Sequence, residues 1–318
     1  MNQNQWQNFI IHLEDNCIKD FSNLISDEKK AVEILKPAIM DSVGKSCKGK
    51  FGVAFSGGVD STLIAFIAKK LGHKFTCYTV GLENAQDVVH ARKISKELGF
   101  NIREKILTLD ELDNIVRDVV KILKEPDVTK VSVGAVGYAI FDMAKSDGVE
   151  TIFTGLGSEE IFAGYDRHAK ALESLGENNN ENNKNENHSP NNFKALHEEC
   201  WKGLKGMWQR DLSRDFAIAE KFGIEISAPF LEKEVIVSAM NIHPKLKLDS
   251  EHKKIILRKT AESIGLPKEF AWRGKKAAQY GSKFILGLDK LSRRNGFGMK
   301  KDYLASLTQY AIPQHHHP

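Results

Sequence analysis

Two patterns of hydrophobic residues alternate along the chain, one typical of strands and the other typical of helices. Apolar runs predict buried strands at residues 51–55, 74–80 and 151–154, and residues 101–107 are also strand-like. Apolar residues spaced three and four apart predict helices at residues 28–40, 62–68, 85–98, 110–123 and 132–144. Because helices alternate with buried strands, we predict an α/β fold whose parallel sheet is covered by helices on both faces.

The same patterns divide the chain into four segments. Residues 1–50 form a helical lead-in, and residues 51–175 form the α/β core. Residues 176–192 are rich in asparagine and almost devoid of apolar side chains, which predicts a mobile surface insert. Residues 193–318 are mainly helical, with an extended break at 226–230 where Pro229 disfavours helix at the preceding residue.

Composition excludes several classes of protein. With 41% hydrophobic and 28% charged residues among 318, the chain matches an ordinary globular protein. No apolar run reaches the roughly eighteen residues of a membrane span, and the first residues lack a secretory signal, so we expect a cytoplasmic protein. A net charge of +4 is too mild to require a nucleic-acid partner. The four cysteines are widely spaced without a C-x-x-C pair, which argues against a zinc or iron–sulfur site.

The segment S-G-G-V-D-S at residues 56–61 lies between the first strand and the next helix. Gly57 and Gly58 allow positive φ and close approach of a ligand, and the following helix directs unpaired N–H groups into the turn. This arrangement predicts an anion site, most often for phosphate. The lysine and longer spacing of a G-x-x-x-x-G-K-[ST] loop are absent, and a plain glycine turn is the alternative.

Three strand ends are predicted to meet at this loop, because ligands of open α/β sheets bind at the carboxyl ends of the strands. The predicted nucleotide contacts are Ser56, Gly57, Gly58, Asp60, Ser61, Val80, Gly81, Thr154 and Gly155.

An ordered set of segments carries a family resemblance. The loop resembles the pyrophosphate-binding loop of the ATP pyrophosphatase (PP-loop) superfamily, and further segments resemble the synthetase domain of the asparagine synthetase family. These segments are G-L-G-S-E-E-I-F-A-G-Y at 155–165, residues 211–233, K-I-I-L-R at 254–258 and A-W-R-G-K at 271–275. The resemblance covers residues 28–285 and implies a fold like the adenine nucleotide alpha hydrolases, with ATP as cofactor. It implies that a carboxylate attacks the α-phosphate of ATP and forms an adenylate.

Two carboxylates are candidates for holding Mg²⁺ beside the pyrophosphate. Asp60 belongs to the loop, and Glu159 occupies the position of the family's metal-binding aspartate. Asp60 could instead cap the helix, and Glu159 could simply favour the first turn of a helix.

Lys275 matches the family's lysine that contacts the α-phosphate, whereas Lys276 has no such counterpart; a surface lysine is the alternative. Leu156 replaces the glutamate that asparagine-forming members are thought to use when ammonia attacks. Asp211 matches a carboxylate of the lactam-forming relatives and could act as a base. The alternative for Asp211 is a salt bridge with Arg210 or Arg214.

The leading hypothesis is an AMP-forming ligase that adenylates a carboxylate, aspartate by default, and transfers it to ammonia or an amine. The family's glutaminase domain is absent ahead of residue 51, so we expect free ammonia, a separate glutaminase subunit or an amine substrate. A homodimer is an open option. The alternatives are a PP-loop enzyme that modifies tRNA, favoured by basic pairs at 293–294 and 300–301, and a non-catalytic nucleotide-binding relative.

Overall fold

A computed structural model of the chain describes residues 2–173, 189–274 and 277–309. Contacts within the chain divide it into two compact units. The first unit comprises Met1–Cys47, Gly155–Gln209 and Ala228–Trp272, and the second comprises Lys48–Thr154, Arg210–Ser227 and Arg273–Pro318. None of the helices in the described ranges is long and apolar enough to span a membrane.

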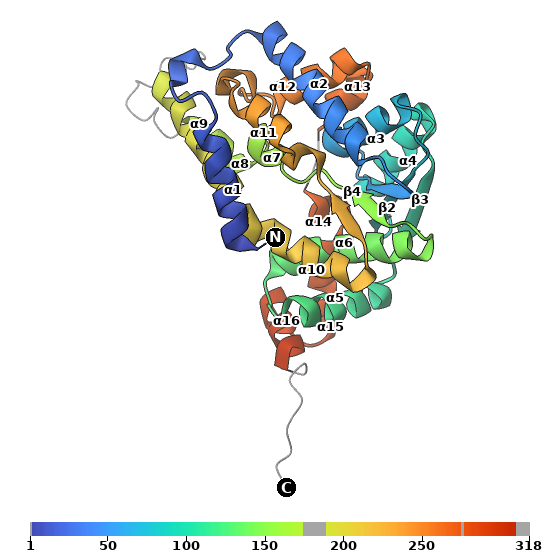
Figure 1. Ribbon diagram of the computed structural model, residues 1–318. Coiled ribbons are helices and arrows are strands. Elements are labelled where there is room, and N and C mark those ends of the chain that lie inside the picture. The colour runs from blue at the N-terminus through green and yellow to red at the C-terminus, as the bar shows by residue number, and fades with distance from the viewer. Residues whose placement is uncertain (1, 174–188, 275–276, 310–318) are drawn as a thin grey trace. The chain divides into compact units, whose positions relative to one another are not determined.

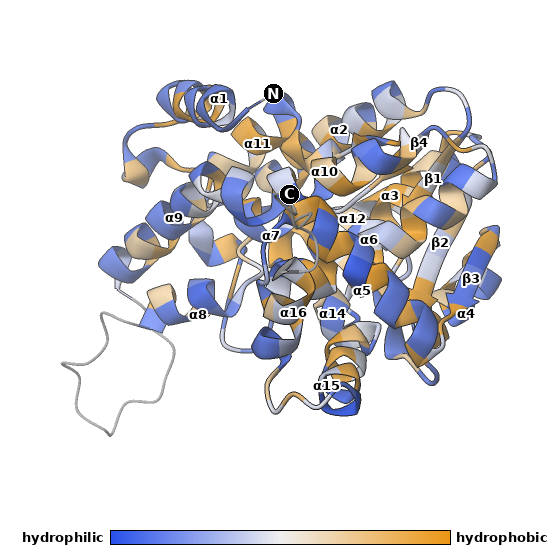
Figure 2. Cartoon of the chain, turned by 90° about the horizontal axis from the view of Figure 1, so that it is seen from below, coloured by the Kyte–Doolittle hydropathy of each residue, from blue (hydrophilic) through white to orange (hydrophobic). Residues whose placement is uncertain are grey.

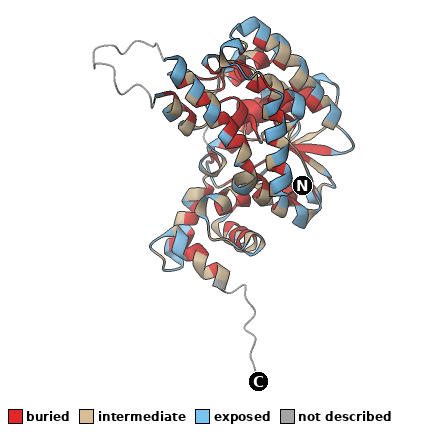
Figure 3. Ribbon diagram, turned by 60° about the vertical axis from the view of Figure 1, so that its left-hand side comes forward, coloured by how far each residue is buried: buried red, intermediate tan, exposed pale blue. Residues whose placement is uncertain are grey.

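The described part of the second unit contains one five-stranded parallel sheet, with the strand order β3-β2-β1-β4-β5. The strands are β1 (Phe51–Ala54), β2 (Thr76–Gly81), β3 (Ile102–Ile106), β4 (Thr151–Phe153) and β5 (Glu225–Ser227). Val53 of the central strand lies opposite Cys77 on one side and Phe153 on the other. These three side chains have no exposed surface, which is typical of a parallel sheet. Figure 3 shows buried positions in red in the interior and exposed positions in pale blue mainly on the outer helices and loops.

Helices cover both faces of this sheet, as predicted. They are α3 (Val59–Lys70), α4 (Gln86–Leu98), α5 (Leu109–Leu123), α6 (Val128–Ser146), α10 (Ser213–Phe222), α14 (Ala278–Gly281), α15 (Phe284–Arg294) and α16 (Lys300–Gln309). In Figure 1, α3 and α4 lie on one side of the strands, whereas α6 and α10 lie on the other. Helices α5 and α15 pack on α6 and extend the core on that side. The α/β prediction is therefore confirmed.

The sequence analysis expected an extended break at residues 226–230; the structure shows a paired strand at Glu225–Ser227, followed by a 3₁₀ turn at Pro229–Leu231 in place of extended chain. Strand β5 pairs in parallel with β4, and Phe153 lies opposite Ser227. A three-residue strand is too short to show a period of two, so its pattern could not be separated from that of a loop.

The regular structure of the first unit, in its described residues, is helical apart from two isolated β-bridges, Ile25 with Ile242 and Leu248 with Lys253. Its α-helices are α1 (Gln3–Asp15), α2 (Glu28–Ser46), α7 (Ser158–Ile161), α8 (Asp166–Glu173), α9 (Pro190–Lys205), α11 (Lys233–Met240), α12 (Ile255–Ile264) and α13 (Lys268–Ala271). Short 3₁₀ turns are η1 (Phe21–Asn23), η3 (Pro229–Leu231) and η4 (Pro244–Leu246). Figure 2 shows polar and apolar colour together along α1, whose buried residues include Trp6 and Ile10. Helix α2 packs against α11 and α12.

Helix α9 begins within the asparagine-rich stretch of the sequence. Residues 174–188, which hold most of the predicted insert, lie outside the described residues. The helix starts at Pro190 with Ser189 as its N-cap. The buried Asn192 amide donates to the Leu172 carbonyl oxygen (2.6 Å), so the last part of this stretch is ordered by packing on α8.

Lys247, in the first unit, is a lysine with no exposed surface. Its Nζ lies 3.7 Å from the Met240 Sδ, and no carboxylate of the described chain pairs with it. Burial lowers the pKa of Lys247, and burial also raises the pKa of the neighbouring Cys17 and Cys200 thiols to about 11. These cysteines, like Cys47 and Cys77, are free thiols.

We expect Lys247→Met to stabilise the protein at pH 7 by about 1–3 kcal/mol, because methionine removes a buried polar group without a strong partner. The unfolded chain keeps this amine protonated up to the ordinary lysine pKa of 10.5. Since the folded state binds this proton less tightly, its stability should rise with pH up to that value, and the substitution should flatten the rise. Thermal unfolding between pH 7 and pH 10 measures both effects. The exposed Lys245→Met is the control, and a lower melting temperature of Lys247→Met at every pH would contradict the expectation.

Candidate functional site

The order of the strands identifies one edge of the sheet as a ligand site. Strand β2 lies on one side of β1, and β4 lies on the other. The connections from β1 therefore leave in opposite directions, and ligands of open α/β sheets bind at the carboxyl end of the strands at such a point. The glycine loop, residues 55–58, follows β1 there and leads directly into α3.

The backbone of this loop is shaped by its two glycines. Gly57 adopts a φ of +67°, and Gly58, at φ −71°, is the N-cap of α3. The Gly58 N–H donates to the Ser56 Oγ (3.3 Å), and the Ser61 Oγ donates to the Gly58 carbonyl oxygen (3.3 Å). Both serines predicted to belong to the site thus hold the turn in shape.

The start of α3 has the properties of an anion site. Within the described residues, no side chain caps this helix end. The first-turn N–H groups therefore carry the positive end of the helix dipole into the loop. Asp60, only 3% exposed, lies at the second helical position, so the alternative that it forms the N-cap is wrong.

We expect Gly57→Ala to destabilise the protein by about 1–3 kcal/mol, because alanine is strained at this φ. It should also weaken ATP binding by about tenfold. A Cβ at Gly57 would lie 2.9 Å from the Ile94 Cδ1 and 3.4 Å from the backbone of Ala91, which would push the loop away from α4. The matched control is Gly72→Ala, which has a similar φ of +83° but open space around it. Thermal unfolding and ATP titration of both variants check this; equal ATP affinities would contradict it.

The predicted nucleotide contacts at the ends of β2 and β4 differ in the groups that they offer to a ligand. The Gly81 carbonyl oxygen accepts from the Leu107 N–H (2.9 Å), and a Cβ at Gly81 would lie 2.4 Å from the Ala85 Cβ. Val80 is buried beside it. The Thr154 N–H is bonded to the Ser227 carbonyl oxygen (2.9 Å), but its buried Oγ1 has no partner among the described residues. Thr154 therefore offers an unused hydroxyl at the end of β4.

Asp211 forms the salt bridges that the sequence analysis gave as the alternative to a role as a base. It lies in the π-helical turn Trp208–Leu212, and its carboxylate contacts the Arg210 Nε (2.7 Å) and the Arg214 Nη1 (3.4 Å). Arg214 also binds the partly buried Asp215 through two bonds of 2.7 and 3.0 Å. Burial raises the pKa of Asp215, although the Arg214 charge opposes the shift. The sequence analysis missed Asp215, which shares one arginine with Asp211.

Gly155 and Glu159 belong to the first unit. Glu159 lies in the first turn of α7. This position also fits the alternative in which Glu159 simply favours the first turn of a helix. Its Oε1 lies 2.8 Å from the Nζ of Lys254, a lysine that is 4% exposed and also reaches the Ser158 Oγ (3.0 Å). A Cβ at Gly164 would overlap the Glu159 Oε2, so the glycine makes room for this carboxylate.

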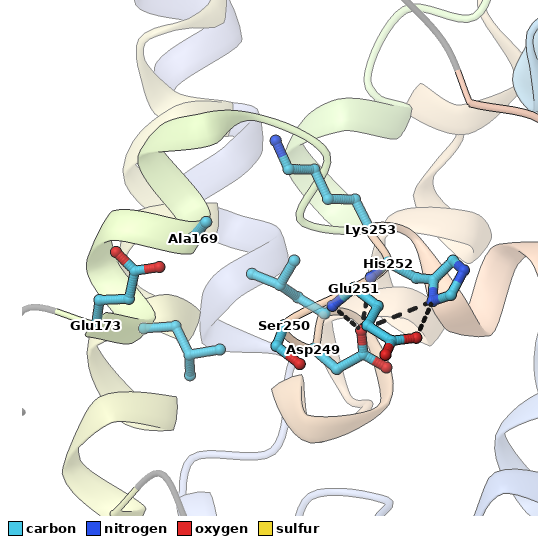
Figure 4. Close-up of a pocket in the computed structure, with 9 residues that line it drawn as sticks. Ala169, Glu173, Asp249, Ser250, Glu251, His252 and Lys253 are labelled. Carbon is cyan, nitrogen blue, oxygen red and sulfur yellow. Dashed lines mark hydrogen bonds and ion pairs between the residues drawn. The ribbon is translucent and has the colours of Figure 1, made fainter. Parts of the chain in front are cut away.

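A cavity of about 150 Å³ in the first unit lies apart in sequence from every predicted site residue (Figure 4). Its lining includes Glu173 and the turn 249–253, in which the Asp249 Oδ1 accepts from the N–H groups of Glu251 (2.8 Å) and His252 (2.6 Å). Among the described residues, no group of three or more His, Cys, Asp or Glu side chains could hold a metal ion. The acidic lining of this cavity does not suit an anion.

Lys275 lies outside the described residues, as does Lys276. The residues around them are placed in the second unit. Arg273 donates to backbone carbonyl oxygens of the glycine loop, and the Ser282 carbonyl oxygen accepts from the Leu82 N–H (3.0 Å). In the sequence, Arg273 belongs to the A-W-R-G-K segment at 271–275. Its contact with the glycine loop could not be predicted from the sequence alone.

Comparison with known proteins finds one family of relatives. The family model described as asparagine synthase matches residues 35–295. A protein of Methanocaldococcus jannaschii, provisionally named as a glutamine-hydrolysing asparagine synthetase, is 31% identical over 92% of this chain and 59% of its own length. The glutamine-hydrolysing asparagine synthetase B of Escherichia coli is 29% identical over 76% of this chain and 43% of its own length.

Among solved structures, an NMN synthetase from Francisella tularensis is 17% identical, covers 71% of this chain and 99% of its own, and has a TM-score of 0.31. The chain spans about half the length of the curated relatives it matches. Since the family model covers most of the chain, including the glycine loop and the segments at 155–165 and 254–258, this chain belongs to the asparagine synthase family.

Proposed function

We propose that this chain forms the synthetase part of an ATP-dependent ligase that adenylates a carboxylate and releases pyrophosphate. Attack of the carboxylate oxygen on the α-phosphorus would break the bond to the bridging oxygen of pyrophosphate. Ammonia or an amine would then attack the acyl carbon, giving an amide, AMP and a proton. Aspartate is the substrate we propose by default.

The observation that supports this proposal most strongly is the glycine loop at the end of β1. Gly57 has the left-handed conformation, and α3 begins at Val59 without a side-chain cap among the described residues. Negative charge builds on the departing pyrophosphate, and preorganised N–H groups stabilise such charge most when they need not reorient. The Thr154 Oγ1 is a further proposed contact for the nucleotide.

The carboxylates of the chain suit Mg²⁺, which prefers hard oxygen ligands and usually needs only one or two of them beside phosphate oxygens. We propose Asp60 and Glu159 as these ligands. Gly164 leaves the space that the Glu159 carboxylate occupies, and Lys254 fixes one of its oxygens. When bound, the metal would neutralise charge on the pyrophosphate.

Lys275 is the proposed stabiliser of charge at the α-phosphate, and Asp211 is the proposed base for the attacking amine. Leu156 cannot move a proton, so deprotonation must involve another group. The ion pairs of Asp211 with Arg210 and Arg214 fix the position of its carboxylate.

The nitrogen donor is proposed to be free ammonia, a separate glutaminase subunit or an amine substrate, and a homodimer remains an open proposal. The basic pairs near the end of the chain give no support to a nucleic-acid partner. Arg293 and Lys300 pair with Asp289, and Arg294 pairs with Asp110 (2.6 Å). These cations are already bound to carboxylates of the same unit.

Trapping with hydroxylamine tests the proposed reaction without needing the natural nitrogen donor. Incubation with ATP, Mg²⁺, aspartate and hydroxylamine should give aspartyl hydroxamate and AMP in equal amounts. Formation of ADP instead of AMP would show attack at a different phosphorus and would refute the proposal.

A further inference from the structure

The Arg273 guanidinium binds the glycine loop through two consecutive carbonyl groups. Its Nε donates to the Gly57 carbonyl oxygen (2.7 Å), and its Nη2 donates to the Ser56 carbonyl oxygen (3.2 Å). The planar fork of arginine presents two N–H groups in a fixed geometry, so one guanidinium can hold both carbonyls in a defined direction. Arg273 therefore joins a segment more than 200 positions away in the sequence to the loop.

This contact fixes the direction of the loop's N–H groups. In a trans peptide, the C=O and N–H bonds point in opposite directions. The Ser56 carbonyl shares its peptide with the Gly57 N–H, and the Gly57 carbonyl shares its peptide with the Gly58 N–H. When Arg273 holds both carbonyls, both N–H groups must point away from the guanidinium.

The packing around Gly57 restricts the loop from a second direction. A Cβ at Gly57 would lie 2.9 Å from the Ile94 Cδ1 and 3.4 Å from the backbone of His90 and Ala91, so the loop packs closely on α4. The Arg273 charge lies close enough to His90 to lower its pKa, although burial is the larger cause. Helix α4 and Arg273 together leave the loop little freedom to turn its peptides over.

We propose that Arg273 is a positioning residue of the pyrophosphate site: it holds the peptide 56–57 so that the Gly57 N–H faces the pyrophosphate of ATP, and it holds the peptide 57–58 in the orientation in which the Gly58 N–H bonds the Ser56 Oγ (3.3 Å). This inference rests on the proposed function, since that function makes the loop a pyrophosphate site. Hydrogen bonding to a carbonyl also strengthens the N–H of the same peptide as a donor. Arg273 thus supports anion binding through the backbone.

The test compares the binding of magnesium pyrophosphate, ATP and adenosine by titration calorimetry. Arg273→Met should weaken pyrophosphate and ATP binding by about tenfold or more, and Arg273→Lys should recover only part of this loss. Adenosine, which lacks phosphates, should bind with unchanged affinity. The matched control is Arg92→Met, an exposed arginine of α4 paired with Glu104 (2.7 Å), which should bind all three ligands normally.

Two further measurements separate the positioning role of Arg273 from other roles that this side chain could have. The Gly57 and Gly58 amide resonances should shift in ligand-free Arg273→Met, and the His90 pKa should rise. The effect on pyrophosphate binding should persist in a Lys275→Ala background, because it acts through the loop. Unchanged pyrophosphate affinity, or equal losses for pyrophosphate and adenosine, would overturn the inference. A wild-type protein that binds pyrophosphate but never forms an adenylate would refute the proposed function alone.

Discussion

Lys275→Ala is expected to lower the rate of adenylate formation by about a hundred- to a thousandfold, the usual effect of removing one preorganised stabiliser of transition-state charge. The affinity for ATP should change far less, because the charge at the α-phosphate grows mainly as the pyrophosphate leaves. Stopped-flow measurement of pyrophosphate release at saturating ATP and aspartate gives the rate directly.

The neighbouring Lys276→Ala is a close control, because it removes the same charge one position further along the chain. It should leave the rate of pyrophosphate release within about twofold of the wild type, because Lys276 matches no position of the family motif. Equal losses in the two variants would assign the effect to general positive charge in this segment. A normal rate in Lys275→Ala would remove Lys275 from the site.

Breaking the ion pair between Glu159 and Lys254 is the second change with a large expected effect. Lys254 is 4% exposed, and its Nζ lies 2.8 Å from the Glu159 Oε1. Glu159→Gln would remove this negative charge from beside the buried ammonium group. Because the Glu159 side chain is 23% exposed, we expect a cost of about 1–3 kcal/mol, less than the ~3–5 kcal/mol of a fully buried pair. We therefore expect a clear fall in the midpoint of urea unfolding.

A double substitution separates stability from function at this pair. Glu159→Gln with Lys254→Met removes both charges and should recover most of the lost stability, because a methionine in place of a buried lysine is tolerated. If Glu159 holds Mg²⁺, this stable double variant should still require much more Mg²⁺ than the wild type for pyrophosphate release. A double variant with the normal Mg²⁺ requirement would leave Glu159 with a structural role only. Lys253→Met, next in the chain and more exposed, is the matched control.

Much of the fold could be predicted, because its central strands are continuous apolar runs and its helices carry regular apolar spacing. Strands β1, β2 and β4 contain buried residues such as Val53, Cys77 and Phe153, and burial on both faces produces such runs. Strand β5 could not be predicted, since its three residues Glu225–Ser227 lie at the sheet edge and owe their extended shape to pairing with β4. Tertiary contact, not local preference, determines such a strand.

The candidate site was predictable where it depends on local backbone chemistry. Two adjacent glycines before a helix were enough to predict the loop at residues 56–58, since positive φ and an uncapped helix start are local properties. The contacts that support this loop come from distant segments. Arg273 reaches the Gly57 carbonyl, and Lys254 reaches Glu159. The sequence showed these residues as parts of motifs, but pairing between distant segments requires the fold.

The exchange of labelled pyrophosphate into ATP tests the central claim most directly, because it requires a reversible adenylate and no nitrogen donor. With Mg²⁺ and aspartate, or with another carboxylate from a panel of amino acids, the wild-type protein should incorporate label into ATP, and Lys275→Ala should lose nearly all of this exchange. Absence of exchange with every carboxylate, in a protein that binds ATP, would contradict the assignment of this site to adenylation and favour a non-catalytic nucleotide-binding role.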